Sequence, residues 1–226
     1  MIFMSIIIPV YNEEKHISHL INKILKVINK LKYKFEIIVV NDGSTDNTKI
    51  ELQNFKDKII LLNKENGGKG SAVKYGVKMS KGNFILIQDG DLEYNPEDYE
   101  KMIMKISKNK VVIGSRTLEN NKRLSKQSYG PWLFNKLLSN IYFYIFKIKI
   151  TDSLSGYKIY PKEFIKNAFI KTSGFETDHE LICKAIKNNY ELEEVAIQYK
   201  PRTKSEGKKI NAIDGLKAIY TILRFK

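Results

Sequence analysis

The sequence predicts a single α/β domain whose mostly parallel central sheet is flanked by helices. Its 226 residues fit one domain, and 42% of them are hydrophobic, which is enough to build one core. Short, continuous apolar segments are typical of strands that are buried on both faces, as in a parallel sheet. Such segments alternate with helical patterns as far as residue 115, and this alternation favours an open sheet with crossover helices.

The predicted strands are recognised by their runs of apolar side chains. A late strand is predicted differently, because Val195, Ile197 and Tyr199 alternate with polar residues. After residue 115 the regular alternation of strand and helix ends, so the second half is expected to be a modified continuation of the same domain. The strands are Ser5–Val10, Phe35–Asn41, Ile59–Asn63, Phe84–Asp89 and Val111–Ser115, followed by Ser155–Tyr160 and Glu194–Lys200.

The first helix is predicted to begin at Asn12. Asn12 is a suitable N-cap, and Glu13 and Glu14 would suit the positive end of the helix dipole. Apolar residues from Ile17 to Leu31 then recur at helical spacing. The other predicted helices are Asp46–Phe55, Lys69–Lys81, Pro96–Ser107, Leu137–Phe146, Pro161–Phe169 and Thr177–Asn188, and a last helix closes the chain.

A polar cluster follows each of the first four predicted strands. Ligands of open α/β sheets bind beyond the carboxyl ends of the strands, where these four loops would meet. The sequence therefore predicts one ligand site at this edge. In chain order, the clusters are Pro9–Glu13, Asn41–Asp46, Asn66–Gly70 and Asp89–Asp91.

Asp89 and Asp91 are the candidates for a metal site. They flank Gly90 directly after a buried strand, so their oxygens could bind Mg²⁺ or Mn²⁺ that bridges to phosphate groups. Such an ion would neutralise the charge that develops on a diphosphate leaving group. Two solvated acids in a turn are the alternative, and the position at the ligand edge favours the metal site.

Two further residues of this edge are candidate ligand contacts. Asp42 could accept hydrogen bonds from a nucleobase or ribose, or could shape an Asx turn. Lys69 is long enough to reach a diphosphate, although an isolated lysine is more often a surface residue. The chain has neither the P-loop nor the GxGxxG spacing, which disfavours kinase-like ATP binding and Rossmann-type dinucleotide binding.

The net charge of +14 is concentrated in two segments of the second half. Residues 101–150 carry eleven basic residues and one acidic residue, and residues 200–226 carry eight basic and two acidic residues. Basic segments of this kind bind nucleic acid, phospholipid surfaces or phosphorylated substrates. Between them, Leu137–Phe146 is apolar on nearly all sides, too short to span a bilayer and bracketed by lysines. It is either a buried helix or an interfacial helix on a membrane.

The N-terminus and the cysteine content bear on location. The first apolar segment follows no basic residue and leads into a proline and acids, so it is predicted to be a strand and not a signal peptide. The single cysteine excludes a disulfide framework and gives no indication of an oxidising compartment. A cytoplasmic location is therefore expected.

Seven motifs together resemble the family-2 inverting glycosyltransferases of the GT-A (nucleotide-diphospho-sugar transferase) fold. The resemblance covers essentially the whole chain, and QDGDLEYNPEDY and DSLSGYK resemble the branch of the dolichol-phosphate mannose synthases and polyprenyl-phosphate glucosyltransferases. It implies a nucleotide-sugar donor, a polyprenyl phosphate acceptor and Mg²⁺ or Mn²⁺ on the paired aspartates. Without transmembrane helices after the catalytic domain, the chain resembles the soluble or peripheral subtype. The motifs are SIIIPVYNEE, VNDGSTDNT, NGGKGSAVKYGV, QDGDLEYNPEDY, GSR, DSLSGYK and GFETDHE.

The resemblance also implies roles for individual residues. Arg116 and Arg202 match basic positions that bind acceptor or donor phosphates, with Lys122 and Arg123 assisting. Glu93 matches a position that often supplies a third polar metal ligand. The residues implied to contact base and ribose are Pro9, Tyr11, Glu13 and Asp42, and the predicted catalytic residues are Asp89, Asp91, Arg116 and Arg202.

The predicted function is metal-dependent, inverting transfer of a hexose from a donor of the GDP-mannose or UDP-glucose type to a polyprenyl or dolichyl phosphate. A phosphate monoester is already an anionic nucleophile at neutral pH, so this reaction requires no general base. Residues 1–115 would bind the nucleotide-sugar, and residues 116–226 would bind the acceptor with membrane-facing basic and apolar elements. The protein would be peripherally attached to the membrane, directly or through a membrane partner protein.

Other functions remain open at this point. A family-2 glycosyltransferase that acts on a saccharide hydroxyl in cell-surface glycan synthesis would need a general base, for which Asp178 and Glu180 are candidates. The same two acids would also suit a helix N-terminus. Asp152 either lies near the sugar or shapes a turn. A basic nucleic-acid-binding domain would explain the charge but not the clusters at one edge, so no nucleic-acid partner is expected. A pseudo-enzyme or a membrane-associated scaffold is the last alternative.

Overall fold

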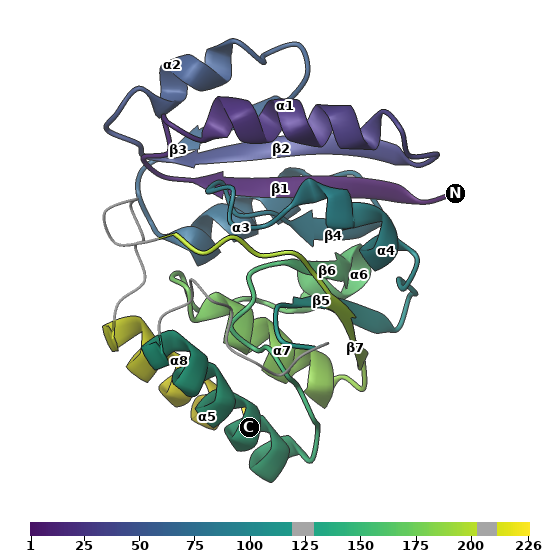
Figure 1. The fold of residues 1–226 in the computed structure, drawn as a ribbon, viewed down its shortest axis with the longest axis vertical. Coiled ribbons are helices and arrows are strands. Elements are labelled where there is room, and N and C mark those ends of the chain that lie inside the picture. The colour runs from purple at the N-terminus through teal and green to yellow at the C-terminus, as the bar shows by residue number, and fades with distance from the viewer. Residues whose placement is uncertain (119–128, 203–211) are drawn as a thin grey trace.

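The computed structural model describes residues 1–118, 129–202 and 212–226. Its strands are β1 (Phe3–Val10), β2 (Lys34–Asp42), β3 (Ile60–Lys64), β4 (Phe84–Ile87), β5 (Lys110–Ser115), β6 (Lys158–Pro161) and β7 (Glu191–Ala196). Among the described residues they form one sheet in the order β3-β2-β1-β4-β6-β5-β7 (Figure 1). Neighbouring strands are parallel except where β6 pairs with β4 and β5. The predicted mostly parallel sheet is confirmed.

Helices cover both faces of this sheet (Figure 1). They are α1 (Ile17–Ile28), α2 (Thr48–Gln53), α3 (Lys69–Met79), the 3₁₀ helix η1 (Pro96–Asp98), α4 (Tyr99–Ile103), α5 (Tyr129–Phe146), α6 (Lys162–Asn167), α7 (Thr177–Lys187) and α8 (Ala212–Arg224). Apolar residues of α1, α2 and α4 join one core cluster, and those of α3, α6 and α7 join the other. Helices α5 and α8 lie side by side and extend the second cluster (Figure 1).

The central strand β1 explains why the strand segments are continuously apolar. Ile6 and Ile8 belong to the cluster under α1, whereas Ile7 belongs to the cluster under α3, and none of the three is exposed. Side chains alternate between the two faces of a strand, so a strand that is covered on both faces is expected to carry apolar residues on both. Each such side chain contributes roughly 1.5–3 kcal/mol of burial free energy.

The predicted N-cap at Asn12 is wrong. Helix α1 begins five residues later, at Ile17, and Asn12 has a positive φ of 51°. Its side-chain oxygen accepts a hydrogen bond from the backbone N–H of Thr45 at 2.8 Å, and its own N–H donates to Oγ of Ser44. Asparagine tolerates the left-handed conformation, so Asn12 here ties the loop after β1 to the loop after β2.

Two predicted elements of the second half also differ. Strand β7 ends at Ala196, because Tyr199 has left the sheet edge and forms an isolated antiparallel bridge with Tyr94. The apolar helix is longer than predicted, from Tyr129 to Phe146, and it is not simply a buried helix: Tyr142 is fully buried, but Tyr144 is 72% exposed. Within the described residues, no helix combines the length and apolar character that crossing a bilayer requires.

Candidate functional site

A cleft of about 850 Å³ opens at the carboxyl edge of the sheet. Its walls include residues from the loops after β1, β3 and β4 and Asp42 at the end of β2, so the predicted convergence at this edge is confirmed. The sheet edge is not the whole site, because Phe134 of α5 and Gly215 and Ala218 of α8 line the same cleft. The first half of the chain thus supplies a polar wall, and the two outer helices supply an apolar one.

Arg202, which follows β7, is hydrogen-bonded to three acidic side chains of the cleft. Its guanidinium donates to Oδ2 of Asp91 at 2.7 Å and to Oε2 of Glu13 at 3.1 Å, and its backbone N–H donates to Oε1 of Glu93 at 2.8 Å. Burial and the nearby charge of Glu93 raise the pKa of Asp91, and Arg202 opposes them. Charge-assisted bonds of this kind hold the segment after β7 against the loops after β1 and β4.

Asp89 is held by a different cation. The Nζ of Lys69, in the first turn of α3, lies 2.7 Å from Oδ1 of Asp89 and 3.1 Å from Oδ2 of Asp178. Burial would lower the pKa of Lys69, but Asp178 and Asp89 outweigh it and raise the pKa, so the lysine stays protonated. Lys69 is therefore a buried member of the site and not an isolated surface lysine.

Asp42 shapes the glycine-rich loop after β3. Its carboxylate accepts hydrogen bonds from the backbone N–H groups of Gly67 at 3.0 Å and Gly68 at 2.8 Å, and from Nζ of Lys64 at 2.5 Å. Gly68 has a φ of 89°, which a residue with a side chain rarely adopts. The turn that begins after β2 is made by Asn41, whose side chain accepts from Ser44 N–H, and not by Asp42.

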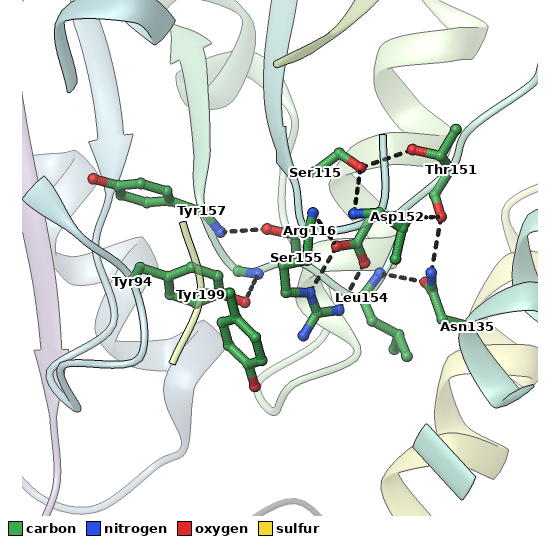
Figure 2. A network of polar contacts seen from close by, with 12 residues as sticks. Tyr94, Ser115, Arg116, Asn135, Thr151, Asp152, Leu154, Ser155, Tyr157 and Tyr199 are labelled. Atoms are coloured by element: carbon green, nitrogen blue, oxygen red, sulfur yellow. Dashed lines mark hydrogen bonds and ion pairs between the residues drawn. The ribbon is translucent and has the colours of Figure 1, made fainter. Parts of the chain in front are cut away.

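Figure 2 shows how Arg116 is oriented by Asp152. The guanidinium makes two parallel hydrogen bonds to the carboxylate, at 2.6 and 2.7 Å, and the backbone N–H of Arg116 adds a third at 2.9 Å. The guanidinium carbon lies 4.8 Å from the centre of the Tyr199 ring. Asp152 is fully buried, so this bidentate pair fixes the plane of Arg116 at the cleft.

The motif DSLSGYK packs against QDGDLEYNPEDY. The backbone N–H of Gly156 donates to the hydroxyl of Tyr94 at 3.0 Å, and the rings of Tyr94 and Tyr157 stack with centroids 5.2 Å apart (Figure 2). A Cβ at Gly156 would collide with the carboxylate of Asp89 and approach Nζ of Lys69. The absence of a side chain at Gly156 allows this loop to lie directly on the acidic edge.

The predicted site residues within the described part of the chain are brought together in this cleft. Asp178 also lines it, whereas the carboxylate of Glu180 is bonded to Lys171, Thr172 and Lys184 outside it. Lys122 and Arg123 lie outside the described residues. The predicted residues that line the cleft are Pro9, Tyr11, Glu13, Asp42, Lys69, Asp89, Asp91, Glu93, Arg116 and Arg202.

Sequence reasoning missed several lining residues. Tyr94 stands inside a recognised motif, yet nothing in its spacing indicates that its ring faces the cleft. Phe134 lies one turn before the predicted apolar helix, which begins at Leu137. Tyr199 falls in the predicted strand Glu194–Lys200, and its place beside Arg116 depends on the early end of β7. Aromatic residues near recognised motifs are the signal that could have found them.

The paired aspartates could supply some, but not all, of the ligands of a magnesium or manganese ion. Asp89 and Asp91 offer carboxylate oxygens, which these ions prefer, from one turn at the edge of the cleft. Within the described residues, no group of three or more His, Cys, Asp and Glu side chains is arranged to hold a metal. The residues therefore fit an ion whose remaining ligands come from a diphosphate and water, which is the usual way that Mg²⁺ binds.

The paired acids and three cations at the carboxyl edge of this sheet agree with the class that the family comparison shows, a nucleotide-sugar-dependent glycosyltransferase. The sequence profile of glycosyl transferase family 2 matches residues 5–169, and the chain belongs to that family. The chain is 30% identical over 232 residues to a dolichyl-phosphate beta-glucosyltransferase of Dictyostelium discoideum, covering 93% of this chain and 69% of the relative. A Saccharomyces cerevisiae protein with the same name is 32% identical, covering 88% and 67%.

Solved structures confirm the predicted GT-A fold. The chain superimposes on glucosyl-3-phosphoglycerate synthase from Mycobacterium tuberculosis with a TM-score of 0.75, covering 99% of this chain and 80% of the synthase. The synthase was solved with Mn²⁺, UDP and glucosyl-3-phosphoglycerate bound. Sequence identity is 17%, so this likeness concerns the fold.

Proposed function

We propose that the protein transfers glucose, with inversion, from UDP-glucose to dolichyl phosphate or a similar polyprenyl phosphate. The names of its relatives support both the sugar and the acceptor, and the alignments span about nine tenths of the chain. The UDP-bearing structural neighbours favour UDP over GDP as the nucleotide. The observation that carries the proposal is that Asp178 and Glu180, the two candidate bases, are committed to other contacts.

A hydroxyl acceptor needs a base whose pKa lies near neutrality. Burial would raise the pKa of Asp178, but Lys158 and Lys69 outweigh it and hold the pKa below its ordinary range. Glu180 also has a lowered pKa: burial raises it, and hydrogen bonds from Lys184 and Thr172 outweigh that effect. Neither acid is suited to remove a proton at pH 7. An acceptor that is already anionic needs no such step, and this favours a phosphate over a saccharide hydroxyl.

On the donor side, Tyr11, Glu13 and Asp42 would contact the base and ribose. Lys69 and Arg202 lie where their charges would stabilise the departing diphosphate. A Mg²⁺ or Mn²⁺ ion held by Asp89 and Asp91, with Glu93 beside them, would supply further charge neutralisation to that leaving group. The residues of the chain orient the donor. The phosphate oxygen of the acceptor attacks the anomeric carbon from the side opposite the diphosphate, and the bond from that carbon to the diphosphate breaks to release UDP.

On the acceptor side, Arg116 presents a fixed planar cation to the cleft and suits a lipid phosphate. Phe134 of α5 and Gly215 and Ala218 of α8 add an apolar wall to the same cleft. A polyprenyl chain is apolar along its length and would lie against this wall. A fixed cation next to an apolar wall supports an acceptor that carries a phosphate at the end of a hydrocarbon chain.

The outer faces of α5 and α8 suit the surface of an anionic membrane. Large apolar side chains are exposed along both helices, and basic side chains lie beside them. An apolar element combined with a polybasic surface is the two-signal arrangement for peripheral attachment. The exposed apolar residues include Leu133, Leu137, Phe143 and Tyr144 of α5 and Leu216 and Tyr220 of α8, and the basic residues include Lys136, Lys147, Lys149, Lys217 and Arg224.

The transfer is tested with purified protein, Mn²⁺ and dolichyl phosphate, comparing radiolabelled UDP-glucose with GDP-mannose. We expect labelled glucose in the lipid phase from UDP-glucose alone. Transfer from GDP-mannose would overturn the donor assignment. Transfer to a saccharide and not to the lipid phosphate would overturn the acceptor assignment.

Membrane attachment is tested by flotation with vesicles of phosphatidylcholine, with and without phosphatidylserine. We expect the wild-type protein to float with the anionic vesicles, and the double variant Leu137→Asp, Leu216→Asp to float less. Lys78→Gln, in the last turn of α3, is the control for a general loss of positive charge. A wild-type protein that stays unbound would contradict direct attachment and favour a membrane partner protein.

A further inference from the structure

Lys158 is a fully buried lysine that does not line the cleft, although its charge helps to lower the pKa of Asp178. Burial lowers the pKa of Lys158 itself, and the nearby carboxylate of Asp178 opposes this effect. Lys158 begins β6 and ends the motif DSLSGYK. An ammonium group loses its hydration in the interior, so its burial is unfavourable unless protein groups replace the water. The Nζ of Lys158 donates to the carbonyl oxygen of Ser155 and lies 3.6 Å from Oδ1 of Asp178.

Asp178 links this buried lysine to the cleft. One carboxylate oxygen faces Lys158, and the other lies 3.1 Å from Nζ of Lys69, which in turn lies 2.7 Å from Asp89. Charges of opposite sign therefore alternate along four side chains: Lys158, Asp178, Lys69 and Asp89. The last three line the cleft, whereas Lys158 lies behind them and is not exposed.

The alternation fixes the position of Lys69. Lys69 is shared by two acids, so the position of its Nζ against Asp89 depends on the attraction that Asp178 exerts from the other side. Lys158 supplies the second cation that satisfies Asp178, so that this carboxylate need not draw Lys69 away from Asp89. The loop around Gly156 closes the arrangement, since it passes directly against Lys69 and Asp89.

Stability alone does not account for a lysine at this position. A methionine has nearly the same length and would fill the space in β6 without a desolvation penalty, and apolar replacement of buried ion pairs is often neutral or stabilising. Three other members of the charge chain face the reaction site. The link from Lys158 to these three side chains therefore offers a functional reason for the buried charge.

We propose that Lys158 is a positioning residue for glycosyl transfer, which acts through Asp178 to hold the ammonium group of Lys69 against Asp89. Lys69 then faces the diphosphate of the donor with its charge already oriented, as electrostatic stabilisation of a leaving group requires. Lys158 itself touches no substrate. The expected effect on kcat rests on the proposed function. The placement of Lys69 does not, because it is a structural property.

The kinetic test compares Lys158→Met, Asp178→Asn and the double variant. We expect each single variant to lower kcat by about 100-fold, as a misplaced catalytic group does, with the dissociation constant for UDP and Mn²⁺ changed by less than about threefold. The double variant should be no slower than the slower single variant, because both changes break the same chain. Lys110→Met removes a lysine from the neighbouring strand β5 that pairs with Glu191 and Glu193, and it should leave kcat unchanged.

A merely structural role would lower the thermal midpoint of Lys158→Met and leave kcat unchanged below that temperature, and this result would overturn the proposal. Losses that multiply in the double variant would also overturn it, since they would show that Lys158 and Asp178 act separately. If Lys158→Met does not fold, Lys158→Gln replaces it and is judged by the same criteria.

A crystal structure of Lys158→Met separates this proposal from the proposed function. We expect Nζ of Lys69 to have moved away from Asp89 towards Asp178, whatever acceptor the enzyme uses. An unchanged contact between Lys69 and Asp89 would overturn the positioning role even if glucose transfer is found. A wild-type protein that transfers no glucose would overturn the proposed function, while a displaced Lys69 would still support the positioning role.

Discussion

The guanidinium of Arg202 lies 2.7 Å from the carboxylate of Asp91, although 111 positions separate the two residues. Asp91 belongs to the loop after β4 in the first half of the chain, and Arg202 follows β7 in the second half. Their contact brings the segment that follows β7 to the carboxyl edge of the sheet, beside the loop after β4. A cation is therefore present beside the predicted metal ligands as a property of the fold.

Replacing Arg202 with Gln should lower kcat/KM by about 100-fold, the effect of removing one preorganised donor to a developing charge. The variant also leaves Asp91 and Glu13 without their common cation, so its thermal midpoint should fall. Lys200→Gln is the matched control, because it removes an exposed positive charge two residues away that has no ion-pair partner among the described residues. Equal activity in the two variants would contradict a role for Arg202 in the site.

Replacing Arg116 with Lys should raise the KM for dolichyl phosphate by about tenfold, with the affinity for UDP unchanged. Lysine keeps the charge but cannot make the two parallel bonds to Asp152 that set the plane of the guanidinium. Steady-state kinetics with varied acceptor, together with calorimetry of UDP, measure the two effects. A larger change in UDP affinity than in the acceptor KM would place Arg116 on the donor side.

Replacing Gly156 with Ala should abolish most of the activity, because the added methyl group would displace the carboxylate of Asp89 or Nζ of Lys69. Gly130→Ala is the control: a Cβ at Gly130 meets nothing within 4 Å, and alanine is the better helix former in α5. Activity and thermal midpoint are measured for both. Full activity in Gly156→Ala would show that the loop can move without consequence for the acidic edge.

The sequence predicts the acidic edge well, because each polar cluster directly follows its own strand. The position of Asp89 and Asp91 after β4 depends only on local order along the chain and on the general rule for parallel sheets. The ion pairs of these acids could not be predicted. Arg202 pairs with Asp91 and Lys69 pairs with Asp178 only because the strand order β4-β6-β5-β7 brings distant parts of the chain together, and no local spacing encodes that order.

Asn12 shows why a local rule can fail. It has the residue type and the following acids of an N-cap, yet its side chain bonds to Thr45 across two loops and the helix begins at Ile17. Lys158 shows the reverse case, since a lysine in a short strand gives no sign that it is fully buried. In both cases a contact distant in sequence decides the outcome.

The stability of the protein should fall as the pH is lowered from about 6.5 to about 4. Burial and the nearby ammonium of Lys158 lower the pKa of His179 from 6.5 to about 4, while Asp178 opposes them. Below pH 6.5 the unfolded chain therefore binds a proton that the folded chain does not, so the free energy of unfolding decreases with falling pH. One such group contributes up to about 1.4 kcal/mol per pH unit in this window.

Urea unfolding of the wild type and of His179→Gln at a series of pH values isolates this effect. His179 packs with Tyr142, whose hydroxyl lies 3.1 Å from its Nδ1, so the variant should be less stable at pH 8. The difference between the two proteins should then shrink as the pH falls towards 4. A difference that stays constant would mean that His179 is not held neutral in the folded protein.

Calorimetric titration of UDP-glucose into the wild type and Asp91→Asn, each with Mn²⁺ and with EDTA, is the most direct test of a metal-assisted donor site at the edge after β4. We predict that the wild type binds UDP-glucose at least tenfold more tightly with Mn²⁺, a difference of about 1.4 kcal/mol, and that Asp91→Asn loses this gain. Equal affinity under all four conditions would contradict the account, because the paired aspartates would then take no part in holding the donor.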